Sequence, residues 1–451
     1  MCPAERTAIV HTWRFTWLLG IILLLTACGQ SVSRFEDTSQ ETIPSDRVPI
    51  VIVPGISREV ARQLNGSIIP FSGLSLRIDG EALAHLGDPR FPVDGDRPLG
   101  VPGELDKALR GTDVRGVQAL INHLIQQEGY IRGDPEQPRD KDYPENPESV
   151  RTDRKRLASL FVVYYDWRRD VAESACILAE RVARIRASTG APRVHLVGHS
   201  LGGVVVRYYL RYGGRDAMRD RDCPLGTGEI RPMLNAPGSD SAGRVVTLGA
   251  PYRGSELAFR ALLQDVNLFG FVSLGLQRAI FTMPVAWELL PIAGEDGRVP
   301  LLVDGHGEEQ VSLYDAQTWI ERGWIVGDPK DPERQRFIKT ILARAIALHR
   351  SLVEPNPLEE VVPRLIVGSG CRPTPARAIV VDGKVEFLSR TDTDNPLFDR
   401  IAVPGDGIVS LESSLGVSPA PTLTPVTVCS AHTTYVNDPG TTERITQFLL
   451  R

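Results

Sequence analysis

The chain has 451 residues, of which 42% are hydrophobic and 24% are charged, so its composition is that of a globular protein with ample material for a core. The formal net charge is −5, and the sequence has no long run of Lys and Arg. A nucleic-acid surface needs clustered basic side chains. The composition therefore excludes nucleic acid as a predicted partner.

The first residues have the pattern of an export signal. Arg6 and Arg14 precede the apolar stretch "WLLGIILLLTAC", which is shorter than the roughly 20 residues that span a bilayer but suits a signal peptide. Its end, "LTAC", resembles the site at which bacterial lipoproteins are cleaved and lipidated. We predict a signal peptide over residues 1–27 and a lipid anchor on Cys28, which holds the exported protein at the periplasmic or cell-surface face of a membrane. The alternative is an ordinary signal peptide cleaved after Ala27.

Residues 28–47 are predicted to form a flexible tether. They are polar and rich in Ser, Thr and Glu, a composition that buries too little apolar area to fold alone. With an end-to-end distance of roughly 5 to 6 Å times the square root of its length, the tether holds the folded domain on the order of 25 Å from the membrane.

Export makes disulfides possible. Apart from Cys2 and Cys28, the chain has cysteines that can pair in an oxidising compartment: Cys176, Cys223, Cys371 and Cys429. We favour Cys371 with Cys429, because each follows a short β-rich run and neighbouring strand ends bring Cα atoms to about 5.5 Å. Cys176 then pairs with Cys223. The alternative is that all of these cysteines are free thiols.

Buried strands alternate with helices along the first half of the chain. Continuous apolar runs at residues 48–55, 160–167 and 193–197 predict buried strands, and residues 171–188 have the periodicity of an amphipathic helix. A charged, proline-broken stretch at residues 134–148 predicts a surface loop. Strands that alternate with helices pair in parallel, so the sequence predicts a doubly wound α/β sheet.

Residues 256–357 interrupt this alternation. The stretch contains helical patterns such as "RFIKTILARAIALHRSL", several aromatic residues and no evident sheet strand, so we predict a large, mainly helical cap. The α/β alternation resumes with "RLIVGSG", a hairpin that turns at Asp382 and Gly383, and the strand "PVTV". The predicted core therefore has two parts, residues 48–255 and 358–451.

A candidate nucleophile lies between a predicted strand and a predicted helix. In "VGHSLGG", Ser200 is flanked by glycines, as at a sharp turn that lifts a serine hydroxyl above the edge of a sheet. The backbone N–H of Leu201, at the start of the helix, can then face a substrate oxygen. The alternative is a glycine turn without chemistry.

A serine nucleophile needs a base, and the histidines that follow Ser200 are His306, His349 and His432. His306 lies in a polar loop and His349 at a helix end, whereas His432 follows the last predicted strand, where a doubly wound sheet presents residues above its C-terminal edge. For the acid we favour Asp406, which lies in the constrained loop "PGDGIV" before the histidine.

A metal site is not predicted. His195 and His199 have the spacing of two zinc ligands on a helix, but on a strand that spacing corresponds to about 13 Å, too far to share one ion. Since no cluster of Cys and His replaces it, we predict neither a metal nor a cofactor.

Several motifs together look like the lecithin:cholesterol acyltransferase family of α/β-hydrolases. They are "YYDWR" at residues 164–168, "VGHSLGG" at 197–203, "LGAPYRGS" at 248–255, "MPVAWELLP" at 283–291 and "PGDGIV" at 404–409, with His432. The resemblance implies an α/β-hydrolase fold with Ser200 as nucleophile, Asp406 as acid and His432 as base. It also implies an oxyanion hole formed by the backbone N–H groups of Leu201 and Ile56. Tyr252 departs from the family pattern, so the resemblance does not identify which residues line the acyl pocket.

The resemblance implies acyl-ester chemistry on lipids through an acyl-enzyme. Water as acceptor gives a lipase or phospholipase, and an alcohol gives an O-acyltransferase; the sequence does not distinguish them. The apolar stretch "NLFGFVSLGL", residues 267–276, suits a lid or lipid contact, and equally a helix packed within the cap. An esterase or amidase for small or cell-wall substrates is the second hypothesis. A non-catalytic lipid-binding lipoprotein is the third, and the complete set of Ser, Asp and His opposes it.

Overall fold

A computed structural model describes most of the folded chain. The described residues are 47–57, 110, 114–226, 228–266, 276–293, 298–303, 307–389, 391–416 and 420–451. The predicted signal peptide, Cys28, all but the last residue of the predicted tether, His306 and most of the stretch 267–276 lie outside this range.

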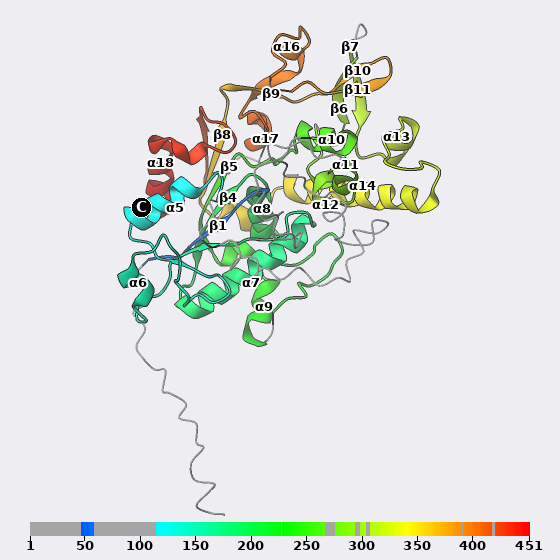
Figure 1. The fold of residues 1–451 in the computed structure, drawn as a ribbon. Helices are drawn as coiled ribbons and strands as arrows, with labels where there is room; N and C mark the ends of the chain where they lie inside the picture. Colours follow the sequence, from blue (N-terminus) through cyan, green and yellow to red (C-terminus); the bar gives the residue numbers. More distant parts are fainter. Residues whose placement is uncertain are drawn as a thin grey trace, which may run out of the picture. The chain divides into compact units, whose positions relative to one another are not determined.

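A parallel seven-stranded sheet forms the centre of the fold (Figure 1). Its strand order is β13-β8-β5-β4-β1-β3-β2, and every neighbouring pair is parallel. The strands are β1 (Ile50–Val53), β2 (Arg132–Gly133), β3 (Leu160–Val162), β4 (Val194–His199), β5 (Ala242–Leu248), β8 (Arg364–Ser369) and β13 (Leu423–Val428). β1 and β4 are buried along their whole length, as continuous apolar runs predict for central parallel strands. The predicted doubly wound sheet is confirmed.

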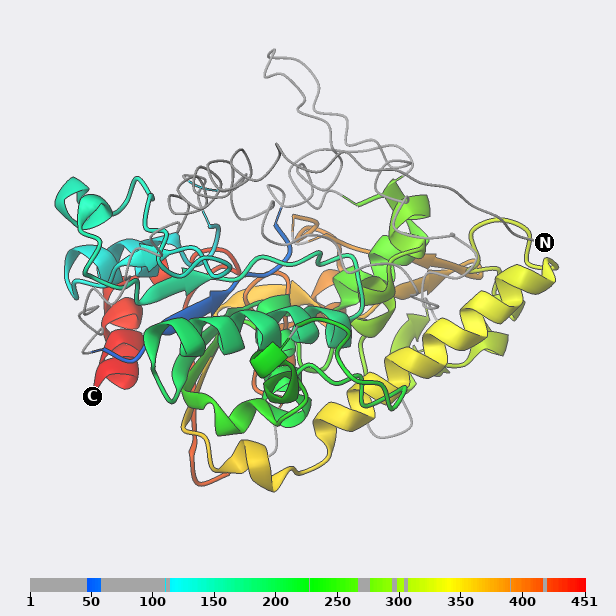
Figure 2. The same cartoon turned by 90° about the horizontal axis from the view of Figure 1, so that it is seen from below.

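Helices flank this sheet (Figure 2). The principal ones are α5 (Gln118–Gln126), α7 (Val171–Thr189), α8 (Leu201–Tyr212) and α18 (Pro439–Leu450). α7 and α8 pack against each other, and α8 also contacts β1, β4 and β5; α18 packs against α5 and β5. α7 begins where the Asp170 side chain accepts a hydrogen bond from the Ala172 N–H, and it ends at Gly190 with a φ of 72°.

Shorter helices complete the fold. They are α6 (Glu148–Thr152), α9 (Arg231–Leu234), α15 (Pro357–Glu360), α16 (Phe398–Ile401), α17 (Leu411–Ser414) and the 3₁₀ turns Gly228–Ile230, Gly238–Asp240 and Tyr435–Asn437. Within the described ranges, no helix combines the length and the apolarity that crossing a bilayer requires.

The stretch 256–357 is mainly helical, as predicted, with an aromatic core. Its helices are α10 (Glu256–Leu263), α11 (Leu276–Phe281), α12 (Pro284–Glu288), α13 (Ala316–Glu321) and α14 (Pro332–Val353). Trp287 and Trp319 pack with ring centroids 4.8 Å apart, and Phe259 meets Trp319 edge to face. Polar contacts join this core to the start of α7: Glu288 accepts a hydrogen bond of 2.9 Å from the Val171 N–H, and Arg344 pairs with Asp170.

The same stretch contains two strands that the sequence analysis missed. β6 (Arg298–Val303) and β7 (Gly307–Ser312) form an antiparallel pair. The predicted hairpin is present as β10 (Ile379–Val381) and β11 (Lys384–Glu386), but β10 pairs with β6 in a separate four-stranded sheet. β12 (Ala402–Gly405), which precedes Asp406, pairs with β9 (Arg372–Pro375) outside the central sheet. The expectation that the hairpin belongs to the central alternation is therefore wrong, whereas the predicted strands "RLIVGSG" and "PVTV" do join the central sheet as β8 and β13.

The predicted surface loop at residues 134–148 is also partly wrong, because its inner side chains are buried. Asp134, Tyr143 and Asn146 have at most 3% of their surface exposed. The Asn146 side chain accepts from the backbone N–H of Arg132 and donates to its carbonyl, at 2.9 and 2.7 Å. Hydrogen bonds to backbone groups thus compensate the burial of these polar residues.

Candidate active site

Ser200 lies at the turn between β4 and α8. It is one of the few described non-glycine residues with a positive φ, 55°, a strained conformation that points a side chain out of such a turn. The Ser200 N–H donates to the carbonyl of Leu248 at the end of β5, at 2.9 Å. At Gly202, a Cβ would lie 2.0 Å from the carbonyl oxygen of Val53, so the turn requires glycine there.

Ser200, His432 and Asp406 come together in one hydrogen-bonded chain. The Ser200 Oγ lies 2.8 Å from Nε2 of His432, and Nδ1 of the same ring lies 2.8 Å from Oδ2 of Asp406. These residues come from the turn after β4, the loop after β13 and the loop after β12. The structure therefore assembles the three side chains that the sequence singled out.

Asp406 is fully buried and held as a carboxylate. Its Oδ1 accepts the N–H groups of Ile408 and Val409, at 2.9 and 2.7 Å. Burial acts to raise the pKa of Asp406. The hydrogen bond and charge of His432, together with the two backbone N–H groups, have a larger effect in the opposite direction, so the pKa of Asp406 lies below its ordinary value. The carboxylate is thus fixed in orientation and ionised.

The two predicted oxyanion-hole donors flank Ser200. Leu201 is the first residue of α8, so its N–H has no acceptor within the helix. Ile56 lies in the loop after β1, and this loop touches the serine: a Cβ on Gly55 would lie 2.6 Å from the Ser200 Cβ. The geometry places both segments beside Ser200.

The "YDWR" residues hold the loop that carries Ile56. The Tyr165 hydroxyl donates to the carbonyl of Pro54 at 2.8 Å, and the Trp167 indole donates to that of Ser57 at 3.1 Å. Both side chains are buried. The motif therefore clamps this loop on both sides of Ile56.

Tyr165→Phe is expected to lower kcat about tenfold with little change in KM, because the loop loses one clamp while the Ile56 N–H remains. This is less than the 10²- to 10³-fold cost of removing an oxyanion donor outright. Steady-state kinetics on a soluble ester measures both constants. The matched control is Tyr212→Phe, which loses a comparable bond of 3.0 Å to the carbonyl of Ser351. An equal loss in both variants would contradict a specific role for the clamp.

His199 contacts His432, which the sequence did not reveal. Its Nε2 lies 2.7 Å from the backbone carbonyl of His432, and the two ring centroids are 5.2 Å apart. Burial, followed by the nearby His432, lowers the pKa of His199 to about 4. A neutral ring that donates from Nε2 therefore ties the end of β4 to the histidine loop.

The remaining residues that the sequence drew attention to, His195, His349 and Tyr252, lie outside the hydrogen-bonded chain of Ser200, His432 and Asp406. Nδ1 of His195 accepts the Arg244 N–H at 2.9 Å, whereas His199 bonds His432, so the two rings serve separate contacts. His349 is buried against Tyr314, in a packing position. Tyr252 is buried and donates to Thr247 at 2.9 Å, so it packs within the fold.

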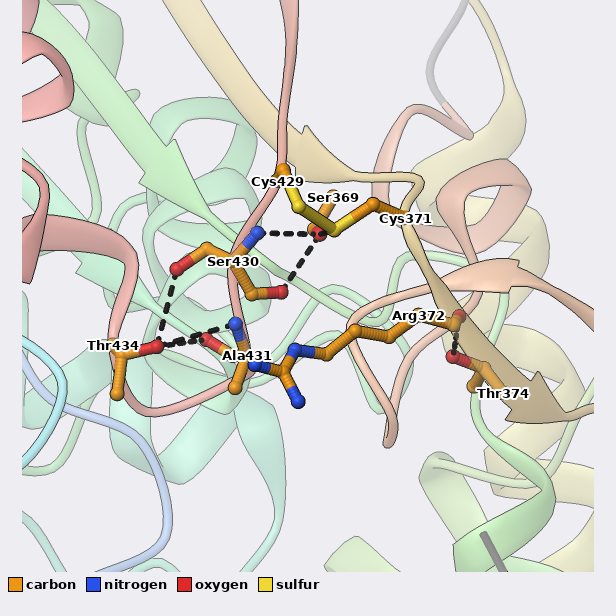
Figure 3. The surroundings of a disulfide bond; sticks show 8 residues. All are labelled: Ser369, Cys371, Arg372, Thr374, Cys429, Ser430, Ala431 and Thr434. Carbon is orange, nitrogen blue, oxygen red and sulfur yellow. Dashed lines mark hydrogen bonds between the residues drawn. A yellow bond between two sulfur atoms is a disulfide. The ribbon is translucent and has the colours of Figure 1, made fainter.

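Both favoured cysteine pairs are joined as disulfides. Cys176 and Cys223 lie 5.5 Å apart at Cα and are buried; Cys371 and Cys429 lie 5.1 Å apart and are exposed. Figure 3 shows the exposed disulfide at the ends of β8 and β13, beside Ser430. Cys429 is three residues before His432, so this disulfide anchors the histidine loop.

Replacing both Cys371 and Cys429 with Ser is expected to lower the free energy of unfolding by about 2 to 4 kcal/mol, because it removes a cross-link between residues 58 apart. It should also lower kcat, since the histidine loop loses an anchor. Replacing both Cys176 and Cys223 with Ser, a pair 47 residues apart, should cost similar stability and leave kcat unchanged in the folded protein. Chemical denaturation and steady-state kinetics measure both effects. Equal kcat in the two double variants would contradict the anchoring role.

Comparison with known proteins finds a family match over part of the chain. The model of the lecithin:cholesterol acyltransferase family matches residues 153–292, a segment that contains Ser200. No curated protein matches the chain significantly. The match confirms the resemblance read from the motifs and the prediction of an α/β-hydrolase enzyme that acts on esters.

Solved structures that resemble this chain include a bacterial lipase. Mature lipase BlEst2 of Bacillus licheniformis is 13% identical, with a TM-score of 0.33, and the alignment covers 64% of this chain and 78% of that one. EstA of Clostridium botulinum is 14% identical, with a TM-score of 0.33 and coverage of 65% and 78%. The product of gene lin2722 of Listeria innocua is 13% identical, with a TM-score of 0.31 and coverage of 90% and 94%.

Proposed function

We propose that this chain is a serine-dependent lipid acyl-ester hydrolase or O-acyltransferase that works through an acyl-enzyme on Ser200. Its residues 153–292 match the model of the lecithin:cholesterol acyltransferase family. The observation that carries the proposal is the continuous hydrogen-bonded chain from Ser200 through His432 to the buried Asp406. A serine hydroxyl with a base in contact and a carboxylate behind that base is the arrangement that nucleophilic acyl transfer needs.

In the first half-reaction, Ser200 becomes acylated. Nε2 of His432 takes the proton of Oγ while Oγ bonds to the carbonyl carbon of the ester, and the electron pair of the C=O π bond moves to its oxygen. The N–H groups of Leu201 and Ile56 stabilise this oxyanion, each by roughly 3 to 4 kcal/mol. The oxyanion then collapses, the C–O bond to the leaving alcohol breaks, and His432 returns its proton to that alcohol.

In the second half-reaction, the acyl group leaves the serine. Water or an alcohol gives a proton to His432 and attacks the acyl carbonyl, and the tetrahedral intermediate expels Ser200, which recovers the proton. Water yields a fatty acid, and an alcohol yields a new ester. Asp406 accepts a hydrogen bond from the Nδ1–H of His432 throughout and stays ionised, which holds the tautomer in which Nε2 is free to accept a proton.

A fluorophosphonate probe tests the proposal. The probe is expected to label the wild-type protein and to leave Ser200→Ala unlabelled, because it reacts with activated serines. An absence of labelling in folded wild-type protein would contradict the proposal and favour the non-catalytic lipoprotein.

Long- and short-chain esters, each with and without an alcohol acceptor, test the substrate class. Preference for long chains supports the lipid assignment, and preference for short esters or amides supports the alternative. New ester in the presence of the alcohol identifies a transferase.

We further propose that the protein is exported and anchored in a membrane through lipid on Cys28. The support is the sequence pattern alone: the basic residues, the apolar stretch and "LTAC". Cys28→Ala is expected to move the protein from the membrane fraction to the soluble fraction of a cell lysate. Equal membrane association of this variant would contradict the anchor.

A further inference from the structure

The catalytic carboxylate has a second side-chain partner besides the histidine. The Tyr435 hydroxyl donates to Oδ2 of Asp406 at 2.9 Å, the same oxygen that His432 reaches at 2.8 Å. Oδ1 is occupied by two backbone N–H groups. Tyr435 therefore shares with His432 the oxygen that faces the base.

Tyr435 is held in this position from several sides. It has no exposed surface, and it opens a 3₁₀ turn three residues after His432. Gly249, with a φ of 56°, allows the approach: a Cβ there would lie 2.7 Å from Cε2 of Tyr435 and 3.0 Å from Oδ2 of Asp406.

Ser369 holds the segment just before His432, as Figure 3 shows. Its hydroxyl donates to the carbonyl of Ser430 at 2.7 Å and accepts the Ser430 N–H at 3.0 Å. One residue at the end of β8 thus fixes the segment that leads to His432 and Tyr435.

Few titratable groups face this cluster. His199, from β4, lies edge-on to Tyr435, with ring centroids 6.5 Å apart, and its low pKa keeps it neutral. α5 and α18 also pack on the 3₁₀ turn. Their titratable side chains point elsewhere: His123 pairs with Glu128, and Glu443 and Arg444 are exposed. Arg372, from β9, forms a backbone bridge with Asp406, and this residue is exposed. Among the groups named here, the hydroxyl contacts Asp406 directly and His432 through the shared oxygen.

We propose that Tyr435 is a positioning residue that weakens the pull of Asp406 on the imidazolium and so sets the pH at which His432 becomes an effective base. The hydroxyl dipole directs its positive end at Oδ2 and offsets part of the carboxylate charge. Without it, the carboxylate stabilises protonated His432 more strongly, and the base stays protonated up to a higher pH. The inference rests on the proposed Ser200, His432 and Asp406 mechanism.

Tyr435→Phe keeps the buried ring and removes the hydroxyl. We expect the acidic limb of the kcat/KM–pH profile to move to higher pH by about 0.3 to 1 unit. We also expect the plateau to fall about three- to tenfold, because Oδ2 loses one of two donors that orient it. The pH profile on a neutral ester measures both.

Tyr435→3-fluorotyrosine is expected to shift the acidic limb in the opposite direction, because its hydroxyl is a stronger hydrogen-bond donor than that of tyrosine. It retains the buried ring, so the fold is preserved. Its acidic limb should move to lower pH. Tyr209→Phe is the matched structural control: it loses a buried hydroxyl bond of 2.7 Å to Ser241 and should leave the limb in place.

The outcomes separate the inference from the mechanism on which it rests. An unmoved limb in Tyr435→Phe, with or without a lower plateau, overturns the role assigned to Tyr435, as does movement in the same direction in both Tyr435 variants. Failure of the proposed function has a different signature, full activity in Ser200→Ala.

Discussion

Ser200→Ala and His432→Ala are each expected to lower kcat by about six orders of magnitude, and the double variant is expected to lose no more. The two side chains act as a unit, because Oγ attacks only as Nε2, 2.8 Å away, takes its proton. Once either is missing, the other has no function in the chemical step. The remaining rate comes from the oxyanion donors and substrate binding.

Single-turnover and steady-state assays of the three variants measure this non-additivity. Ser239→Ala is the control, because it removes a buried serine hydroxyl that has no partner among the residues that the structure describes. A double variant far slower than either single one, or a Ser200→Ala variant that retains a large share of the wild-type rate, would contradict the mechanism.

Asp406→Asn is expected to lower kcat by about four orders of magnitude while the fold is kept. The reason is the direction of the amide. Oδ1 accepts two backbone N–H groups, so the amide oxygen of the variant takes that position and the NH₂ group faces His432. The amide then donates to Nδ1, which forces the proton onto Nε2, and Nε2 can no longer accept a proton from Ser200.

The measurement is kcat on a soluble ester, with chemical denaturation as the test of folding. Asp438→Asn provides the control, because Asp438 caps α18 by accepting the Thr441 N–H and asparagine is an equally good cap. Comparable losses of kcat in the two variants would contradict the tautomer argument, and so would near-normal activity of Asp406→Asn.

The central sheet and the three side chains of the proposed triad were predictable for simple physical reasons. β1 and β3 are apolar along their whole length, and β4 carries an apolar run that is buried throughout, a pattern typical of buried parallel strands. Ser200 is marked by its flanking glycines, and few histidines follow it, so order along the chain identified His432 and favoured Asp406.

The remaining features depend on contacts that leave little trace in sequence. β7 has the sequence "GEEQVS" and only one fully buried residue, so it lacks the apolar alternation that indicates a strand. The sequence of residues 134–148 predicts an exposed loop because it is rich in charged residues, and the backbone groups that bind these side chains are brought close only by folding. Tyr435 and His199 are single residues whose roles come from contacts with segments distant in the chain.

Mapping the acyl group on the protein tests most directly whether Ser200 is the nucleophile. Protein mixed with a long-chain ester whose deacylation is slow, quenched in acid and digested, is expected to carry the acyl group on the peptide that contains "GHSLGG", with fragmentation assigning it to Ser200. The adduct should form at the rate of the first product burst and be absent in Ser200→Ala. An acyl group on another residue would contradict the proposal that this serine is the nucleophile. So would a Ser200→Ala variant that turns over the ester at the wild-type rate without forming a covalent adduct.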